Sequence, residues 1–233
     1  MTVWDALVTG VPSDPAGRVS VGFNWTAVEG PSATGFAATP NRADGAHTTA
    51  ETGTYSGRPL RELAALLTRD NPYERAIGLA AANAHWNTDR PDLADGDGLD
   101  SADPARTVIV GRFPQLERKL PGAVVLERSP GPHDRPAEDA PLVIPEARAL
   151  IITATTLVNG TLASLLDLAG RQTRVTLVGP GTPLCAALFE HGIHSLAGFV
   201  AVDRDGAFQA VREGAGARGF RRFGRAVVLR STD

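Results

Sequence analysis

The sequence lacks the residues and runs on which several classes of function depend. It has one cysteine, Cys185, so it can form no intramolecular disulfide and offers no cysteine spacing typical of a structural zinc site. It has no basic block, and its 23 Lys and Arg are balanced by 26 Asp and Glu, which argues against nucleic acid as a partner. No apolar run approaches the roughly 18 residues of a membrane helix, and the N-terminus carries no signal-peptide pattern. We therefore expect a cytoplasmic protein without a membrane partner.

Enough apolar sequence is present for a packed core. Hydrophobic residues make up 42% of the chain and charged residues 21%, a balance typical of a folded protein. A chain of 233 residues can form one large domain or two small ones. The pattern of the sequence changes at Arg106, and this change favours two domains.

The first half has the pattern of a small α+β domain. Residues 18–28 alternate apolar and polar side chains, which predicts one half-buried strand, and residues 34–39 can pair back on it. A helix is expected over 59–68 and a second one after Asn71, with Pro72 in its first turn. The second helix is rich in alanine, which predicts close packing against the sheet.

After Arg106, short apolar strands alternate with short helices, the pattern of a parallel, Rossmann-like sheet. The predicted strands end at Val110, Leu126, Thr153 and Val178, and right-handed crossovers would place the turns that follow them on one edge. A helix is expected over 183–190. The predicted fold class is α/β: an α+β domain over 1–92, a linker over 93–104 and a Rossmann-like domain over 105–233.

Three sequence blocks carry a family resemblance. They are GLAAANA at 78–84, IITATTLVNGT at 151–161 and GPGTP at 179–183. With these blocks the chain resembles bacterial and archaeal proteins that pair a DUF4213 domain with a DUF364 domain, also called the "putative heavy-metal chelation" domain. The resemblance implies an enolase-N-terminal-like first domain, a Rossmann-like second domain and a site in the cleft between them. It also implies a transition metal or a metal chelate as the bound species, without naming one.

The two polar turns of the second half are the predicted ligand-binding elements. Their hydroxyl, amide and backbone N–H groups lie where helices are expected to begin, and helix N-termini favour anions. The alternative is that these side chains only cap their own helices. No Gly-x-Gly-x-x-Gly follows a strand, so a dinucleotide is not favoured. The predicted ligand-binding residues are Thr155, Thr156, Asn159, Gly160, Thr161, Gly179, Pro180, Gly181 and Thr182, with Asn24 and Asn83 from the first domain.

Two kinds of charged side chain are candidates for chemistry. Glu127 ends a predicted strand on the same edge, where a carboxylate can act as a general acid or base, although a surface position explains it equally well. The basic cluster of Arg218, Arg221, Arg222 and Arg225 either steers an anion or coats the surface, and we favour the surface. His191 and His194 are spaced like a metal pair, but Gly192 between them ends the helix, so metal ligands are not assigned.

Three hypotheses follow from the sequence. The first is a small-ligand binding protein that holds a metal or an anionic, metal-chelating metabolite in the interdomain cleft. The second is an enzyme that acts on a small anionic, pterin- or nucleotide-like metabolite with Glu127 as acid or base. The third is an interaction module without a ligand. The first is favoured, a homodimer is left open, and the sequence specifies neither a metal nor a reaction.

Overall fold

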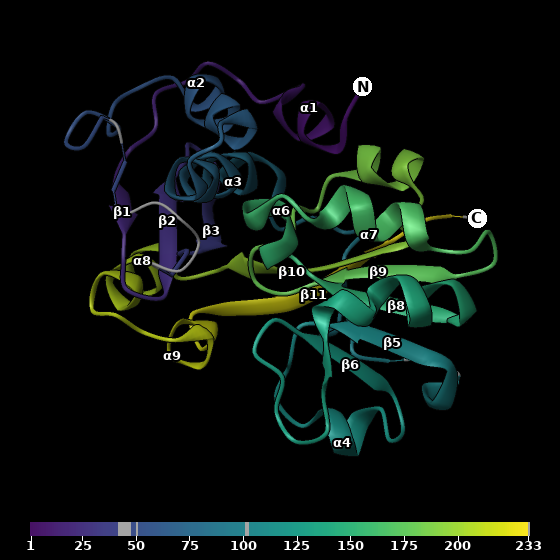
Figure 1. The fold of residues 1–233 in the computed structure, drawn as a ribbon. Coiled ribbons are helices and arrows are strands. Elements are labelled where there is room, and N and C mark those ends of the chain that lie inside the picture. The colour runs from purple at the N-terminus through teal and green to yellow at the C-terminus, as the bar shows by residue number, and fades with distance from the viewer. Residues whose placement is uncertain (42–47, 50, 101–102, 233) are drawn as a thin grey trace.

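The computed structural model describes residues 1–41, 48–49, 51–100 and 103–232. Its N-terminal unit contains an antiparallel sheet in the order β1-β2-β3, with helices packed on one side (Figure 1). The strands are β1 (Val19–Val21), β2 (Trp25–Glu29) and β3 (Thr34–Ala38). The helices are α1 (Val3–Val8), α2 (Leu60–Ala65), the 3-10 helix η2 (Leu66–Thr68) and α3 (Pro72–Trp86).

Helix α3 is the central element of this unit. The Asn71 side chain accepts hydrogen bonds from the backbone N–H groups of Tyr73 (2.9 Å) and Glu74 (3.4 Å), which caps the helix start as predicted. The alanine-rich face packs closely on β3, because a Cβ at Gly35 would lie only 2.1 Å from the Ala80 carbonyl oxygen. The expected close approach of helix and sheet is therefore present.

The C-terminal unit is built on an eight-stranded sheet in the order β4-β11-β10-β9-β8-β5-β6-β7. Strands β10 to β7 in this order are parallel, whereas β11 pairs antiparallel with β10, and β4 pairs antiparallel with β11. The strands are β4 (Ala94–Asp95), β5 (Thr107–Val110), β6 (Val124–Glu127), β7 (Arg135–Pro136), β8 (Ala149–Thr153), β9 (Arg174–Val178), β10 (Ser195–Ala201) and β11 (Gly224–Arg230). The predicted α/β class is confirmed, with a small antiparallel sheet in one unit and a mostly parallel sheet in the other.

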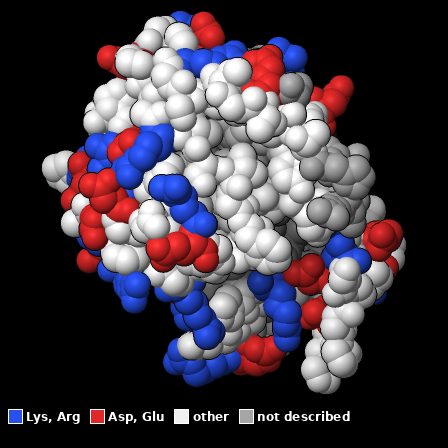
Figure 2. All heavy atoms as spheres, turned by 90° about the vertical axis from the view of Figure 1, so that its left-hand side faces the viewer, with Lys and Arg blue, Asp and Glu red and all other residues white. Residues whose placement is uncertain are grey.

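Short helices connect these strands, and in the described residues none is long and apolar enough to cross a membrane. The α-helices are α4 (Leu116–Lys119), α5 (Ala140–Val143), α6 (Thr155–Asn159), α7 (Leu162–Leu168), α8 (Arg204–Arg212) and α9 (Ala217–Arg221). The 3-10 helices are η3 (Pro104–Arg106), η4 (Ala137–Asp139), η5 (Ile144–Glu146) and η6 (Ala186–His191). Basic and acidic side chains are interspersed on the face of the molecule that Figure 2 shows.

Two features of the chain differ from the sequence-based expectation. The single strand predicted over 18–28 is a hairpin, β1 and β2, closed by a hydrogen bond from the Gly22 N–H to the Trp25 carbonyl (3.0 Å). Phe23 therefore lies at the hairpin tip, 86% exposed, instead of on the buried face. Part of the predicted linker, β4, pairs with β11 at the edge of the large sheet.

The two units are joined by polar contacts as well as by packing. Arg18 of the first unit forms ion pairs with Glu29 (2.8 Å) and with Asp205 of α8. Arg204, the first residue of α8, donates to the carbonyl groups of Gly30 and of Ala33 (3.2 Å) at the β2–β3 turn. These contacts fix α8, and the α9 segment that follows it, against the N-terminal unit.

Candidate functional site

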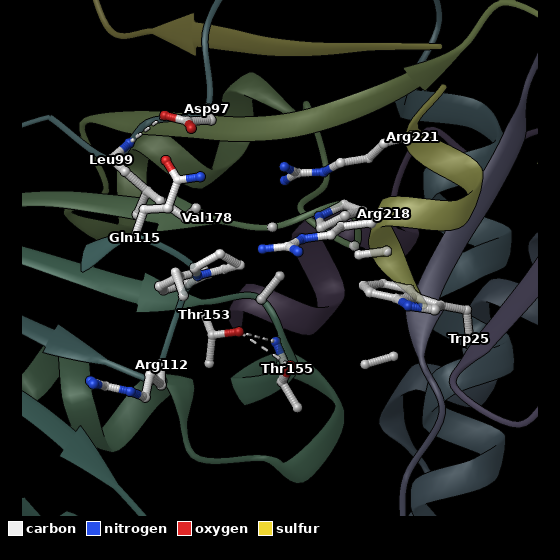
Figure 3. A pocket seen from close by; sticks show the side chains of 18 of the residues that line it. Trp25, Asp97, Leu99, Arg112, Gln115, Thr153, Thr155, Val178, Arg218 and Arg221 are labelled. Atoms are coloured by element: carbon white, nitrogen blue, oxygen red, sulfur yellow. Dashed lines mark hydrogen bonds between the residues drawn. The ribbon is translucent and has the colours of Figure 1, made fainter. Parts of the chain in front are cut away.

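A pocket of about 470 Å³ opens between the two units at the carboxyl ends of β5, β8 and β9 (Figure 3). The N-terminal unit contributes Trp25 and Ala38 to its wall, and helix α9 contributes Arg218 and Arg221. A volume of this size is typical of small-molecule sites. Residues of both units thus line one cavity, and its role as a ligand site stays a prediction.

Helix α9 is held in place by a buried aromatic cluster. Phe220 is 0% exposed and stacks on Phe36 of β3, with ring centroids 4.9 Å apart. Phe220 also forms T-shaped contacts with Phe199 of β10 and Trp25 of β2, with ring centroids 5.4 Å and 5.2 Å apart. Because Phe220 points into this cluster, Arg218 and Arg221 on the other side of the helix extend into the pocket (Figure 3).

The charge of the pocket is predominantly positive. Four of its lining side chains are basic and one, Asp97, is acidic. Lys119 forms an ion pair with Asp97. Burial of Asp97 acts to raise its pKa, but the hydrogen bonds from Lys119 and the Leu99 N–H, together with the charge of Arg221, outweigh this and lower the pKa. Asp97 is therefore ionised at neutral pH and neutralises Lys119.

The remaining arginines of the pocket differ in their partners. Arg112 pairs with Glu117 and with Asp134 (2.9 Å), and its guanidinium points away from the α9 arginines (Figure 3). Arg218 and Arg221 form no hydrogen bond or ion pair with the described part of the chain. Both are exposed to solvent, and arginine stays charged at any physiological pH. The pocket thus presents two guanidinium groups whose donors are available to an anion.

A second pocket, of about 790 Å³, lies beside the first on the same edge of the sheet. Arg112, Thr153 and Thr155 line both pockets. Glu127 and the polar residues after Thr155 line only the second one. The predicted single site is thus divided into two adjoining cavities.

The turn after β8 supplies hydroxyl groups that also bind their own backbone. The Thr156 hydroxyl donates to the Thr153 carbonyl (2.7 Å), and Asn159 Oδ1 accepts from the Thr161 N–H (3.1 Å) and hydroxyl (2.7 Å). Thr155, Thr156, Asn159 and Thr161 line the second pocket, and Thr155 alone of these also lines the first. Gly160, with φ +81°, ends α6 and lines neither pocket.

The turn after β9 has a different conformation from the one expected. Gly179, Pro180 and Gly181 line the first pocket, whereas Thr182 is buried, and its hydroxyl has no partner in the described residues. No α-helix begins at Pro183: the chain stays irregular to Cys185 and then forms the 3-10 helix η6. The predicted helix N-terminus at this turn is therefore wrong, whereas a ligand-binding role for Gly179–Gly181 stays a prediction.

Asn83 of α3 and Asn87, which caps the end of this helix, explain this irregular backbone. Asn87 donates to the carbonyls of Thr182 (2.9 Å) and Phe199 (3.3 Å), and its Oδ1 accepts the Leu184 N–H (2.9 Å). Asn83 donates to the Gly181 carbonyl (2.9 Å) and to the Phe36 carbonyl of β3 (2.8 Å). The two side-chain amides are four residues apart. They provide hydrogen-bond partners for buried backbone groups of the turn, which therefore need no partners within a helix.

The structure therefore separates the two asparagines predicted as ligands from the pockets. Asn83 is fully buried and lines neither pocket. Asn24 lies at the β1–β2 turn, where its side chain donates to the Gly214 carbonyl (2.8 Å). Asn87, which the sequence analysis did not single out, holds the pocket turn; its spacing of four from Asn83 on an alanine-rich helix was the available signal.

Replacing Asn87 by alanine is expected to lower the free energy of unfolding by about 2–3 kcal/mol, because buried carbonyl and N–H groups would lose their partners. Urea unfolding followed by circular dichroism measures this change. Asn159→Ala is the matched control, since Asn159 is only half-buried and bonds only to Thr161 two residues away; less than about 1 kcal/mol is expected there. Equal losses in the two variants would contradict the role given to Asn87.

The remaining candidates are placed as follows. Glu127 accepts hydrogen bonds from the backbone N–H groups of Arg112 (2.6 Å) and Arg128 (3.2 Å) at the edge of the second pocket. His194 Nδ1 accepts the Val175 N–H (3.1 Å). Burial and the charge of Arg174 lower the pKa of His194 and outweigh a hydrogen bond to the Gly192 backbone, which acts to raise it. Within the described residues, no group of three or more His, Cys, Asp or Glu could hold a metal ion.

The basic cluster predicted to coat the surface divides into two pairs. Arg222 lies over the Phe223 ring (4.7 Å) and Arg225 pairs with Asp89 and Asp95 (3.0 and 2.9 Å), as surface residues do. Arg218 and Arg221 line the interdomain pocket instead. The available signal was their i, i+3 spacing around the apolar Phe220.

The profile of the family named DUF364, described as "Putative heavy-metal chelation", matches residues 97–230, more than half of the chain. The chain belongs to the DUF364 family. The profile of DUF4213, which carries the same description, matches residues 5–86. The family resemblance seen in the sequence blocks is thereby confirmed.

Two solved DUF364 structures resemble this chain over nearly its whole length. A protein of unknown function from Desulfitobacterium hafniense DCB-2 has a TM-score of 0.84 at 29% identity, with 98% of each chain covered. A protein of unknown function from Pyrococcus horikoshii has a TM-score of 0.82 at 22% identity, with 97% of each chain covered, and shares the fold. No curated protein matches the chain.

Proposed function

We propose that this DUF364 protein binds a small anionic, metal-chelating ligand in the pocket between its two units. The observation that carries the proposal is the pair of guanidinium groups, Arg218 and Arg221, that line this pocket and form no hydrogen bond or ion pair with the described residues. Guanidinium groups bind carboxylates through two parallel hydrogen bonds, which matches a ligand that carries several carboxylates.

The character of the other walls supports a ligand with an apolar or planar part. The pocket is lined by Trp25, Phe113, Leu99 and Val178 as well as by the two arginines. Indole and phenyl rings bury apolar ligand surface and stack on planar groups. An anionic end at α9 and a planar body against Trp25 would fill the cavity.

A bare metal cation fits this pocket less well than a chelate. Its lining carries four basic side chains, and its one carboxylate, Asp97, is paired with Lys119. Cations in proteins are held by carboxylate, imidazole or thiolate groups, and the described residues hold no cluster of three of these. In this proposal the metal arrives bound to the anionic ligand, which accords with the family description "Putative heavy-metal chelation".

Thermal unfolding with citrate, pyridine-2,6-dicarboxylate or inorganic phosphate, at constant ionic strength, tests the proposal. At saturation, at least one of the two chelating carboxylates is expected to raise the melting temperature by several degrees, because a ligand at 100 times its Kd stabilises the fold by about 2.7 kcal/mol. Titration calorimetry then compares the same anion, its zinc complex and zinc chloride alone. Binding by zinc chloride alone, or no stabilisation by any anion, would contradict the proposal.

The alternative of an enzyme with Glu127 as acid or base gains no support from the geometry. Glu127 lies outside the pocket that contains Arg218 and Arg221. Both its carboxylate oxygens accept backbone N–H groups, which suits an ionised acceptor that stays in one orientation. This arrangement favours a binding role for Glu127.

A further inference from the structure

The order of the parallel strands gives the second pocket a specific place in the fold. Counted from β5 as the first strand, the order β7-β6-β5-β8-β9-β10 is the 3-2-1-4-5-6 order of dinucleotide-binding sheets. In such sheets ligands bind outside the carboxyl ends of the strands, at the point where the strand order reverses. In this sheet that point lies between β5 and β8. The second pocket opens at this point, since Gly111 after β5 and Thr153 at the end of β8 both line it.

Glu127 is the last residue of β6, the second strand in this order. In dinucleotide-binding sheets, an acid near the end of the second strand accepts hydrogen bonds from ribose hydroxyls. The Arg112 N–H donates to Oε1 of Glu127 (2.6 Å), and the Arg128 N–H donates to Oε2 (3.2 Å). A carboxylate has about four acceptor sites, so each oxygen keeps one for a ligand. The two oxygens match the two adjacent hydroxyl groups of a ribose.

The loop after β5 favours a nucleoside over a dinucleotide. Gly111 makes the tight turn, with φ +94°, and its N–H donates to the Leu126 carbonyl (2.9 Å). The Arg112 N–H is already bound to Glu127, and Pro114 has no N–H. Helix α4, which follows, has only four residues. Three of the positions that could donate a backbone N–H to a pyrophosphate in this loop, Gly111, Arg112 and Pro114, therefore offer none.

The rest of the second pocket suits a heterocyclic base. Its apolar wall includes Leu126 of β6, Ala140 of α5 and Leu165 of α7. Thr155 and Thr156 of α6, which carry hydroxyl groups, also line it. A cavity of about 790 Å³ is large enough for a nucleoside.

We propose that the second pocket binds a ribonucleoside, with the Glu127 carboxylate accepting hydrogen bonds from the 2′- and 3′-hydroxyl groups and the base lying against the Leu126–Leu165 wall. This site is separate from the one that holds the anionic chelator. Its ligand is recognised by the vicinal diol, and not by a phosphate.

Titration of the wild-type protein with nucleosides tests the proposal without a mutation. Saturation-transfer NMR and calorimetry with adenosine, guanosine, cytidine and uridine establish which base binds. The 2′-deoxy form of that nucleoside is then expected to bind at least about 10-fold more weakly, because a hydrogen bond to a charged group is lost. Absence of binding by all four ribonucleosides, or equal affinity for the ribo and deoxy forms, overturns the proposal.

Variants distinguish this site from the chelator site. Glu127→Gln is expected to abolish the preference for ribose over deoxyribose while leaving the effect of pyridine-2,6-dicarboxylate unchanged. The double variant Arg218→Gln, Arg221→Gln should bind the nucleoside as wild type does. A Glu127→Gln protein that unfolds at the wild-type temperature and still prefers ribose overturns the assignment; if this variant does not fold, the nucleoside series on the wild type decides.

Discussion

Replacing Arg218 and Arg221 together by glutamine is expected to weaken binding of a chelating dicarboxylate by about 100-fold. Each hydrogen bond between a guanidinium and a carboxylate contributes roughly 1.5–3 kcal/mol, and the lower value applies because both side chains are exposed to solvent. Titration calorimetry with pyridine-2,6-dicarboxylate measures the change. The wild-type affinity should also fall as sodium chloride is raised, since exposed charges are screened by salt.

Arg222→Gln is the matched control for this pair. Arg222 follows Arg221 directly, but its guanidinium lies over the Phe223 ring and outside the pocket. Its replacement removes one positive charge from the same segment, where the double variant removes two. It should change the affinity less than about 2-fold, because only a screened, long-range interaction is lost. A loss as large as that of the double variant would show that the arginines act through net charge and not through contact.

Replacing Phe220 by alanine is expected to lower the free energy of unfolding by about 3–5 kcal/mol, the cost of removing a fully buried phenyl ring. Phe220 is 0% exposed and contacts aromatic rings from β2, β3 and β10. Because the same ring anchors α9, any folded fraction should also bind the dicarboxylate more weakly. Urea unfolding at constant m-value measures the first effect and calorimetry the second.

Phe23→Ala serves as the control for aromatic removal. Phe23 lies at the tip of the β1–β2 hairpin and is 86% exposed, so the change should stay within about 0.5 kcal/mol. A loss below about 1 kcal/mol for Phe220→Ala would show that the aromatic cluster does not hold α9, and the account of how the pocket is built would fail.

Much of the fold could be predicted from local patterns. Apart from the two-residue edge strands β4 and β7, the strands of the large sheet are short apolar runs. The start of α3 carries its own capping residue, Asn71, followed by Pro72 in the first turn. The β1–β2 hairpin could not be predicted in the same way, because the alternation of Val19 and Val21 continues through the turn to Phe23 and Trp25. An alternation with a period of two residues predicts which face of the sheet each side chain is on. It does not predict where the chain turns back to form a second strand.

The candidate site was harder to predict, because its decisive contacts join distant parts of the sequence. The threonines after β8 and the Gly179–Gly181 turn were found from their position at strand ends. The direction of Arg218 and Arg221 depends on Phe220 stacking against Phe36, which lies in the other unit. The backbone at Thr182–Cys185 depends on Asn87 of α3. Neither dependence leaves a periodic signal in the sequence.

The amide side chains of α3 also bear on how this family can diverge. Asn83 belongs to the part of the chain that matches DUF4213 and Asn87 follows directly after it, whereas the turn they hold belongs to the part that matches DUF364. The boundary between the two profiles is therefore not a boundary of the site. We therefore expect a recombinant in which one half is exchanged for that of a distant relative to fold only if it carries a compatible helix and turn together.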